Sequence, residues 1–386
     1  MKIAFVIAGN YNTSLYSVTQ ATVQYLRDRG HQVDLIFLEW FADDLRDNDQ
    51  YIDIKGMSNN SLYSFKGLPF RLLKNLLSRH IYDYFLSRYF CRQLEPLFTG
   101  YDSIFVHGVL CIPLHALRLP FYGVLHSCKT DNFLGRRSRL TRKLYQKVYQ
   151  KVYSGKRLLS VSESVKQDML NNMQAKPTSI ETIYNGFNFD ELINKASQGQ
   201  TENVPEHFIM AAGRPDRTKR FDILLRAYAK TQQTLPLVIF GEGRKLKDLQ
   251  QLAIQLGIQD NVIFWGFCDN LLPYFKQASL YVLSSDVEGL PTVVIESLML
   301  GTPVVATDAG GVRELLTDAG GVRELLGERL KEWIVPRQDV DQLAAKIDAI
   351  LANPPTVSVE DIRFLDYREV GKKYEQMSET MRDGFS

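Results

Sequence analysis

Two glutamates eight positions apart, Glu288 and Glu296, place the strongest restriction on the chemistry of this chain. An apolar run ending at Leu283 predicts a buried strand, and Pro291 suits the first residue of a helix. Such a helix presents free N–H groups and a positive dipole end to a ligand. Glu288 precedes the helix and Glu296 lies within it, so both can contact one extended ligand. Because carboxylates accept hydrogen bonds from hydroxyls, we expect a sugar or ribose as their partner.

A second set of residues can neutralise a diphosphate. The run Phe208 to Ala212 predicts a strand, and Arg214 and Lys219 follow it, before another predicted helix. Arg offers planar, bidentate contact to phosphate, and Lys offers a mobile point charge. A surface cluster of basic residues on a polar loop is the alternative.

His126 ends a predicted strand that begins at Phe121. The ionisation range of histidine would let it hydrogen-bond a substrate or exchange a proton with it, and a structural histidine is the alternative. His107 is a similar residue at a strand end, to which we assign no catalytic role.

The segment from Glu288 to Glu296 resembles the E-x7-E signature of retaining, nucleotide-sugar-dependent glycosyltransferases of the glycosyltransferase 4 type, which have the GT-B fold. The Gly and Pro after the first glutamate and the strand Gly301 to Ala306 also match. Further matches are Gly30-His31-Gln32-Val33, Ser160-Val161-Ser162, Asn185-Gly186 and Gly241-Glu242-Gly243. The resemblance therefore covers nearly the whole chain.

The resemblance implies a role for each candidate residue. Glu296 would bind the ribose hydroxyls of the donor, and Glu288 would face the transferred sugar. Arg214 and Lys219 would stabilise the departing diphosphate, and His126 would contact the donor sugar or assist the acceptor. The expected donor-binding residues are Gly9, Arg214, Lys219, Glu288, Gly289, Leu290, Pro291 and Glu296.

The same resemblance implies transfer with retained anomeric configuration, in which the departing phosphate acts as the base. The catalytic set would be His126, Arg214, Lys219 and Glu288. We expect no metal ion and no cofactor. The family's first loop often has two adjacent glycines near the diphosphate, but this chain has only Gly9 there. The resemblance therefore does not determine how this loop contacts the diphosphate or the acceptor.

At 386 residues, with 45% apolar and 23% charged residues, the chain is long enough for two globular domains. Predicted strands alternate with helices, which indicates an α/β protein with parallel sheets. With the resemblance, we expect a GT-B architecture of two doubly wound Rossmann-like domains facing a central cleft. The expected parts are an acceptor-binding domain at 1–186, a linker at 187–206, a nucleotide-sugar domain at 207–358 and a C-terminal helical segment at 359–386 that crosses back to the first domain.

Basic residues are concentrated between Arg136 and Arg157, a stretch without an acidic residue. Tyr145, Tyr149 and Tyr153 recur there every four residues, which predicts a basic helix with an aromatic stripe. The helix at 136–157 can lie on an anionic membrane leaflet, or it can pack its stripe into the core and expose its basic face. No recognised nucleic-acid-binding module accompanies the charge, so we expect no nucleic-acid partner.

No run of about 18 apolar residues is present. The four cysteines form no metal or redox pair, which fits a reducing compartment. We therefore expect a cytoplasmic protein, with peripheral attachment to the inner face of the cytoplasmic membrane left open by the basic helix.

The ten residues Thr307 to Leu316 are repeated without change as Thr317 to Leu326. This period is too short for a solenoid repeat. The first copy directly follows the predicted strand and takes the position usual for the family. We expect the second copy to be a tolerated surface insertion, since a longer loop costs little closure entropy.

These features predict a glycosyltransferase that moves a sugar from a nucleotide-sugar donor, a UDP-sugar first, to a glycan or lipid-linked acceptor. Family habit suggests bacterial surface polysaccharide, such as lipopolysaccharide, capsule or exopolysaccharide. The alternatives are a sugar-nucleotide epimerase or phosphorylase of the same fold, and a catalytically silent glycan-binding partner subunit.

Overall fold

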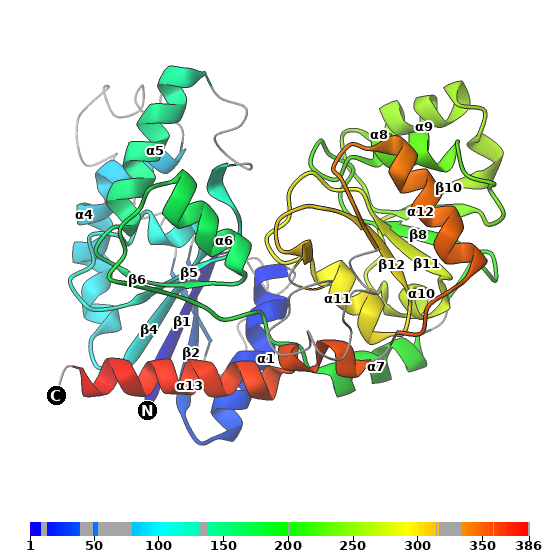
Figure 1. Cartoon of the computed structure of the whole chain (residues 1–386). Helices are drawn as coiled ribbons and strands as arrows, with labels where there is room; N and C mark the ends of the chain where they lie inside the picture. The colour runs from blue at the N-terminus through cyan, green and yellow to red at the C-terminus, as the bar shows by residue number, and fades with distance from the viewer. Residues whose placement is uncertain are drawn as a thin grey trace. The chain divides into compact units, whose positions relative to one another are not determined.

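The computed structural model describes residues 1–8, 14–38, 49–52, 79–130, 138–199, 201–313, 315, 333–357 and 359–384. The chain forms two compact units, one of residues 1–187 with 367–386 and one of residues 188–366. Each unit contains one parallel sheet with helices between its strands, as the predicted α/β, GT-B class requires (Figure 1). The predicted α/β class with two doubly wound domains is therefore confirmed.

The sheet of the first unit has seven parallel strands in the order β3-β2-β1-β4-β5-β6-β7. The order reverses between β1 and β4, which makes the carboxyl ends of these two strands a topological switch point, the usual ligand site of such a sheet. The strands are β1 (Lys2–Ala8), β2 (Gln32–Leu38), β3 (Asp49–Ile52), β4 (Ser103–His107), β5 (Tyr122–Leu125), β6 (Arg157–Ser160) and β7 (Ser179–Thr182).

Helices and short turns cover this sheet. They are α1 (Ser14–Asp28), α4 (Arg79–Phe98), η1 (Gly108–Cys111), α5 (Arg139–Tyr153), α6 (Glu163–Gln167), η3 (Asp168–Asn172) and α13 (Tyr367–Asp383). The last of these, α13, lies beside α1 (Figure 1). From α13, Tyr374 packs its ring against Phe5 of β1 and Phe105 of β4, at centroid distances of 5.6 and 5.0 Å. The C-terminal helix thus completes the core of the first unit.

The second unit has six parallel strands in the order β10-β9-β8-β11-β12-β13. Its switch point lies between β8 and β11. The strands are β8 (Ile209–Ala212), β9 (Leu237–Phe240), β10 (Val262–Gly266), β11 (Leu280–Leu283), β12 (Val304–Thr307) and β13 (Ile334–Val335). The helices are α7 (Phe189–Gln198), α8 (Phe221–Tyr228), α9 (Leu246–Gln255), η4 (Gln259–Asn261), α10 (Leu272–Gln277), α11 (Thr292–Met299), α12 (Val340–Ala352) and η8 (Val359–Leu365).

The segment expected as a polar linker, 187–206, contains the helix α7. Asn188 caps this helix by accepting a hydrogen bond from the N–H of Glu191, and Phe189 and Ala196 are buried. Because α7 packs on α10, it is part of the second unit. The segment expected to cross back, 359–386, also divides, since η8 belongs to the second unit and α13 to the first.

On α5 the aromatic stripe packs into the core, with Tyr145, Tyr149 and Tyr153 each no more than 2% exposed. Leu140 and Leu144 lie on the outside and are 81% and 48% exposed. The exposed face is also basic, with five cationic side chains: Arg139, Arg142, Lys143, Lys147 and Lys151. The core packing of the tyrosines explains the stripe, while the outer face remains both basic and apolar.

Candidate active site

The switch point of the second unit brings together residues that follow β8 and β11. The Nζ of Lys219, after β8, lies 2.8 Å from the Oε1 of Glu288, after β11. Both side chains are largely withdrawn from solvent, at 21% and 13% exposed. Arg214 lies in the same loop as Lys219 but is 78% exposed, and its guanidinium is 3.6 Å from the carboxylate of Asp216. Lys219 and Glu288 therefore form the compact part of the predicted site.

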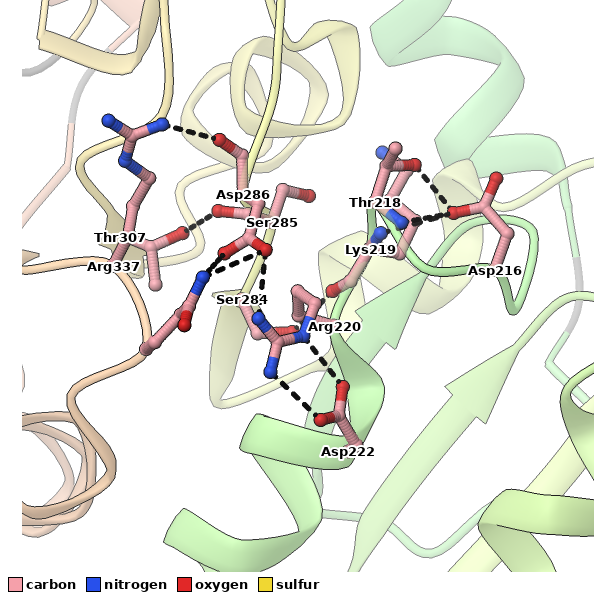
Figure 2. A network of polar contacts seen from close by, with 11 residues as sticks. Asp216, Thr218, Lys219, Arg220, Asp222, Ser284, Ser285, Asp286, Thr307 and Arg337 are labelled. Atoms are coloured by element: carbon pink, nitrogen blue, oxygen red, sulfur yellow. Dashed lines mark hydrogen bonds and ion pairs between the residues drawn. The ribbon is translucent and has the colours of Figure 1, made fainter. Parts of the chain in front are cut away.

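Backbone contacts tie the Lys219 loop to the end of β11. The Ser284 hydroxyl donates to the carbonyl of Lys219 at 2.8 Å, and the N–H of Asp286 donates to the carbonyl of Thr218 at 2.8 Å (Figure 2). Asp216 turns the same loop by accepting from the N–H groups of Thr218 and Lys219. These bonds hold the backbone of Lys219 in place before any ligand binds.

Asp286 is the centre of a second group of contacts, which the sequence did not predict. Its carboxylate accepts from Arg220 at 2.8 Å and from the side-chain amide of Gln338, and its carbonyl accepts from Arg337 at 3.0 Å (Figure 2). Arg220 also forms two hydrogen bonds with Asp222, at 2.9 and 3.0 Å. Arg220 thus clamps the start of α8 to the turn that carries Glu288.

Arg220 has a left-handed backbone, with φ 49° and ψ 42°, at the position before α8. This conformation costs an L-residue about 1–2 kcal/mol. The ion pairs of Arg220 with Asp222 and Asp286 offset that cost, because this backbone conformation lets the guanidinium contact both carboxylates. The strain is consistent with a loop held for function.

The first copy of the ten-residue repeat braces the turn between the two glutamates. Gly310 has φ 54°, and a Cβ on it would lie 1.9 Å from the carbonyl oxygen of Glu288. The neighbouring Gly311 donates its N–H to the carbonyl of Gly289 at 3.1 Å. Only glycine fits here. The second copy, Thr317 to Leu326, lies outside the described residues.

Glu296 lies within α11, and burial raises its pKa to about 7. The carboxyl group thus changes charge near neutral pH. Leu290 and Pro291, which precede the helix, are buried. Pro291 is the cap before α11 and not its first helical residue, because its ψ of 102° is extended.

In the first unit, the candidate His126 follows β5 and contacts His107 at the end of β4. His107 Nδ1 lies 2.9 Å from His126 Nε2, and the two rings stack with centroids 5.1 Å apart. Burial lowers the pKa of His107 well below its usual range and that of His126 to about 3. Both rings are uncharged at neutral pH. The other first-unit candidate, Gly9, lies outside the described residues.

The described part of the chain contains no cluster of three or more His, Cys, Asp or Glu residues able to hold a metal ion. Among the helices of that same part, none has both the length and the apolar run needed to cross a membrane.

Two family models match this chain and together span most of it. The model for "Glycosyltransferase Family 4" matches residues 17–191, and the model for "Glycosyl transferases group 1" matches residues 193–363. The chain belongs to the glycosyltransferase 4, or group 1, family. In this glycosyltransferase the first model matches most of the first unit, and the second model matches most of the second unit.

The relatives and structural neighbours of this glycosyltransferase include enzymes named for a lipid-linked acceptor and for lipopolysaccharide biosynthesis. It is 28% identical over 273 residues, 69% of each chain, to the Campylobacter jejuni N-acetylgalactosamine-N,N'-diacetylbacillosaminyl-diphospho-undecaprenol 4-alpha-N-acetylgalactosaminyltransferase. WaaG, a glycosyltransferase involved in lipopolysaccharide biosynthesis, has a similar structure, with a TM-score of 0.62, 14% identity and coverage of 99% of this chain and 94% of the other.

Anabaena HepE, solved in complex with UDP and glucose, is also similar in structure. The TM-score is 0.61 and the identity 17%, with coverage of 100% of this chain and 98% of the other. At such identities the likeness establishes the GT-B fold and nothing finer.

Proposed function

We propose that this glycosyltransferase moves a sugar from a UDP-sugar to a glycan or lipid-linked acceptor of bacterial surface polysaccharide, with retained anomeric configuration. The observation that carries the proposal is the Lys219–Glu288 ion pair at the switch point of the second unit. In this proposal the cation of Lys219 stabilises a diphosphate, and the adjacent carboxylate of Glu288 accepts from sugar hydroxyls. A nucleotide-sugar presents these two kinds of group next to each other.

In the proposed reaction Lys219 and Arg214 stabilise the negative charge that develops on the departing diphosphate. Groups already in place before the reaction are effective because they need not reorganise in the transition state. Lys219 meets this condition through its held backbone, while the exposed Arg214 provides a mobile cation. The departing phosphate, held on the side that the acceptor attacks, takes the acceptor's proton.

Glu288 serves in this proposal as an acceptor of hydrogen bonds and not as a covalent nucleophile. Its Oε1 is already engaged by Lys219 at 2.8 Å. A carboxylate bound to an ammonium group is a weaker nucleophile, but its remaining lone pairs still accept from sugar hydroxyls. The geometry thus favours a direct transfer over a glycosyl-enzyme intermediate.

Glu296 is proposed to bind the ribose of the nucleotide, as the family resemblance implies. The carboxylate form accepts more strongly from both ribose hydroxyls than the protonated form does. Because burial raises its pKa to about 7, the free site is only partly ionised at neutral pH. Donor binding is therefore expected to release a proton.

The relatives support the choice of donor and acceptor. HepE is described with UDP and glucose, and the Campylobacter enzyme is named for a diphospho-undecaprenol acceptor. A UDP-sugar and a polyprenyl-diphosphate-linked glycan are thus the first substrates to test. The cationic pair Arg214 and Lys219 supplies the positive charge that a metal would supply, so we propose that the reaction needs no metal and that EDTA leaves its rate unchanged.

The function is tested by offering UDP-, GDP- and ADP-sugars with an undecaprenyl-diphosphate-linked glycan and following product by NMR. Formation of a product that keeps the donor's anomeric configuration supports the proposal, and the inverted product contradicts retention. Donor isomerisation without acceptor would indicate an epimerase, and dependence on inorganic phosphate a phosphorylase. A folded protein that binds glycan but transfers from no donor would be a silent partner subunit.

We also propose that the outer face of α5 attaches the protein to an anionic cytoplasmic membrane surface. The face combines five exposed cations with the exposed Leu140 and Leu144. Each cation near an anionic leaflet contributes about 1 kcal/mol, and the leucines can enter the interface. This arrangement would place the enzyme beside a lipid-linked acceptor.

Vesicle sedimentation tests this attachment. We expect binding to phosphatidylglycerol vesicles and not to phosphatidylcholine vesicles, with loss on replacing Lys143, Lys147 and Lys151 by Gln. A control changes Lys245, Lys247 and Lys276 of the second unit to Gln and should keep binding. Equal binding by both variants would contradict a role for α5.

A further inference from the structure

In the histidine contact of the first unit, one ring donates the hydrogen bond and the other accepts it, and the sequence alone does not say which. His107 Nδ1 and His126 Nε2 are 2.9 Å apart, and burial keeps both rings neutral. A neutral imidazole has one N–H and one bare nitrogen. One ring must therefore donate and the other accept, and the choice decides what the second nitrogen of His126 offers to a substrate.

Burial of His107 decides the direction. The residue is 1% exposed, and its Nε2 is buried with no hydrogen-bond partner among the described residues. If His107 accepted from His126, its own N–H would be on that enclosed Nε2, a buried donor without an acceptor. Orphaned buried N–H groups are rarer than orphaned acceptors. The proton of His107 is therefore better placed on Nδ1, where His126 accepts it.

Neighbouring groups fix the ring of His107 in this position. It lies in the β4 strand, whose register pairs it with Val124 of β5, and its ring packs on Phe5 of β1 at 5.6 Å. The strands β1 and β4 form the switch point of this sheet. His107 is thus a buried support directly beneath the edge where a ligand of this unit is expected.

Lys129 adds a second reason for a neutral pair. Its side chain is only 3% exposed, and its Nζ donates to the Ser127 hydroxyl at 3.3 Å. Its positive charge acts with burial to lower the pKa of His126. With a cation beside it, His126 is a poor site for an incoming proton and thus a poor general base.

We propose that His107 is a positioning residue that donates from Nδ1 to His126 Nε2 and so makes His126 present Nδ1–H as a neutral hydrogen-bond donor to a substrate oxygen. This inference rests on the proposed transferase function, in which His126 contacts the substrate. It decides between the two roles implied by the family resemblance, because a ring whose Nε2 is engaged and whose Nδ1 carries the proton cannot take the acceptor's proton.

The tautomer can be read without any activity assay. The chain has six histidines, so two-bond 1H–15N spectra of histidine-labelled protein, assigned with the variants below, are tractable. We expect His126 to show a protonated Nδ1 and a bare Nε2 from pH 6 to 8. A protonated Nε2 on His126 would overturn the proposal.

Three substitutions at His107 separate positioning from packing. His107→Phe keeps a ring against Phe5 but has no nitrogen. His107→Asn places an amide N–H close to the position of Nδ1, while His107→Gln places it close to Nε2. We expect the His126 tautomer to be retained in His107→Asn and to become mixed in the other two. An unchanged His126 spectrum in His107→Phe would overturn the proposal.

The kinetic expectation follows the same order. The transfer kcat should fall about tenfold in His107→Phe and His107→Gln and less in His107→Asn, as the loss of one oriented hydrogen bond implies. The control is His115→Phe, which changes a half-buried histidine of the first unit that stacks on Tyr84. Should the wild type transfer no sugar, the proposed function fails, while the spectra still decide the tautomer.

Discussion

The two switch points of this glycosyltransferase have opposite chemistry. In the second unit, Lys219 pairs with Glu288 and Arg220 with Asp286, each at 2.8 Å and largely withdrawn from solvent. In the first unit, His107 and His126 form an uncharged pair in which burial lowers the pKa of each ring. In the proposed function, the charged edge binds the diphosphate and the neutral edge contacts hydroxyls. A transferase that holds a diphosphate and a sugar needs both.

The largest expected effect comes from removing the cation of the charged edge. Lys219→Ala should lower the transfer rate by about 10²- to 10³-fold, as is typical when a preorganised charge-stabilising group is lost. Steady-state kinetics with saturating donor measures it. The control is Lys230→Ala in the same unit, whose ion pair with Asp341 is largely exposed and which should retain the wild-type rate. Equal rates in all three proteins would remove Lys219 from the mechanism.

The next effect concerns the glycine that supports Glu288. Gly310→Ala should reduce activity about a hundredfold, because a displacement near 1 Å at a catalytic group has this consequence. Its Cβ would lie 1.9 Å from the Glu288 carbonyl oxygen, so that turn must move. The repeat offers a matched control in Gly320→Ala, at the corresponding place of the second copy. We expect that variant to keep its activity, and a loss in both would show that the second copy also supports the site.

A smaller effect is expected at Glu296, where donor affinity should depend on pH because this carboxyl group, unlike Lys219 and Arg214, changes its charge near neutral pH. Donor affinity, measured by calorimetry, should rise from pH 6 to pH 8 in the wild type as the carboxyl ionises through its pKa of about 7. Glu296→Gln should bind about tenfold more weakly at pH 8 and show little dependence on pH. A wild-type affinity that is flat across this range would contradict the assignment.

The same substitution has a stability consequence with a defined sign. In the folded wild type the pKa of Glu296 is raised, so the unfolded chain releases this proton first and stability falls as pH rises from about 4.5 to 7. Glu296→Gln should therefore be more stable than the wild type at pH 8, by about 1–3 kcal/mol. Urea unfolding at pH 5 and pH 8 measures the difference, and a less stable variant at pH 8 would refute burial as the cause.

The smallest effect on donor binding is expected at the neutral edge. His126→Phe should leave the Kd for UDP within about twofold of the wild type, since removing a neutral group from the other unit costs the diphosphate no charge contact.

The pKa of His126 is lowered to about 3, so the contribution of His126 to stability should be lost as pH falls from 6.5 toward 3. Thermal unfolding at pH 5 and 7 should show a weaker pH dependence in the variant.

Most strands could be predicted from sequence because buried parallel strands are short apolar runs. The predicted run Phe208 to Ala212 contains β8, Ile209–Ala212, and the apolar run that ends at Leu283 is β11, Leu280–Leu283. The strand β3, Asp49–Ile52, was missed because two of its four residues are strongly polar and lie within a polar run. The helix α7 was missed because its polar outer face dominates the composition.

The candidate site was predictable where local sequence determines it and not where the fold brings distant residues together. The spacing of Glu288 and Glu296 is set by one turn and one helix, so it could be read directly. The pairing of Arg220 with Asp286 joins residues 66 positions apart, and the contact of His107 with His126 depends on the register of β4 and β5. Only the three-dimensional structure provides such contacts.

The placement of α13 has a consequence for how the chain folds while it is being translated. The chain leaves the first unit after Phe187 and returns at Tyr367, whose N–H donates to the carbonyl of Phe187 at 3.0 Å. The second unit is thus an insertion between two parts of the first. On the ribosome, the continuous second unit can fold as soon as it emerges, while the first must wait for its last helix to cover Phe5 and Phe105. A nascent chain stopped before Tyr367 would therefore expose the earlier-made unit to proteolysis and leave the later-made one protected.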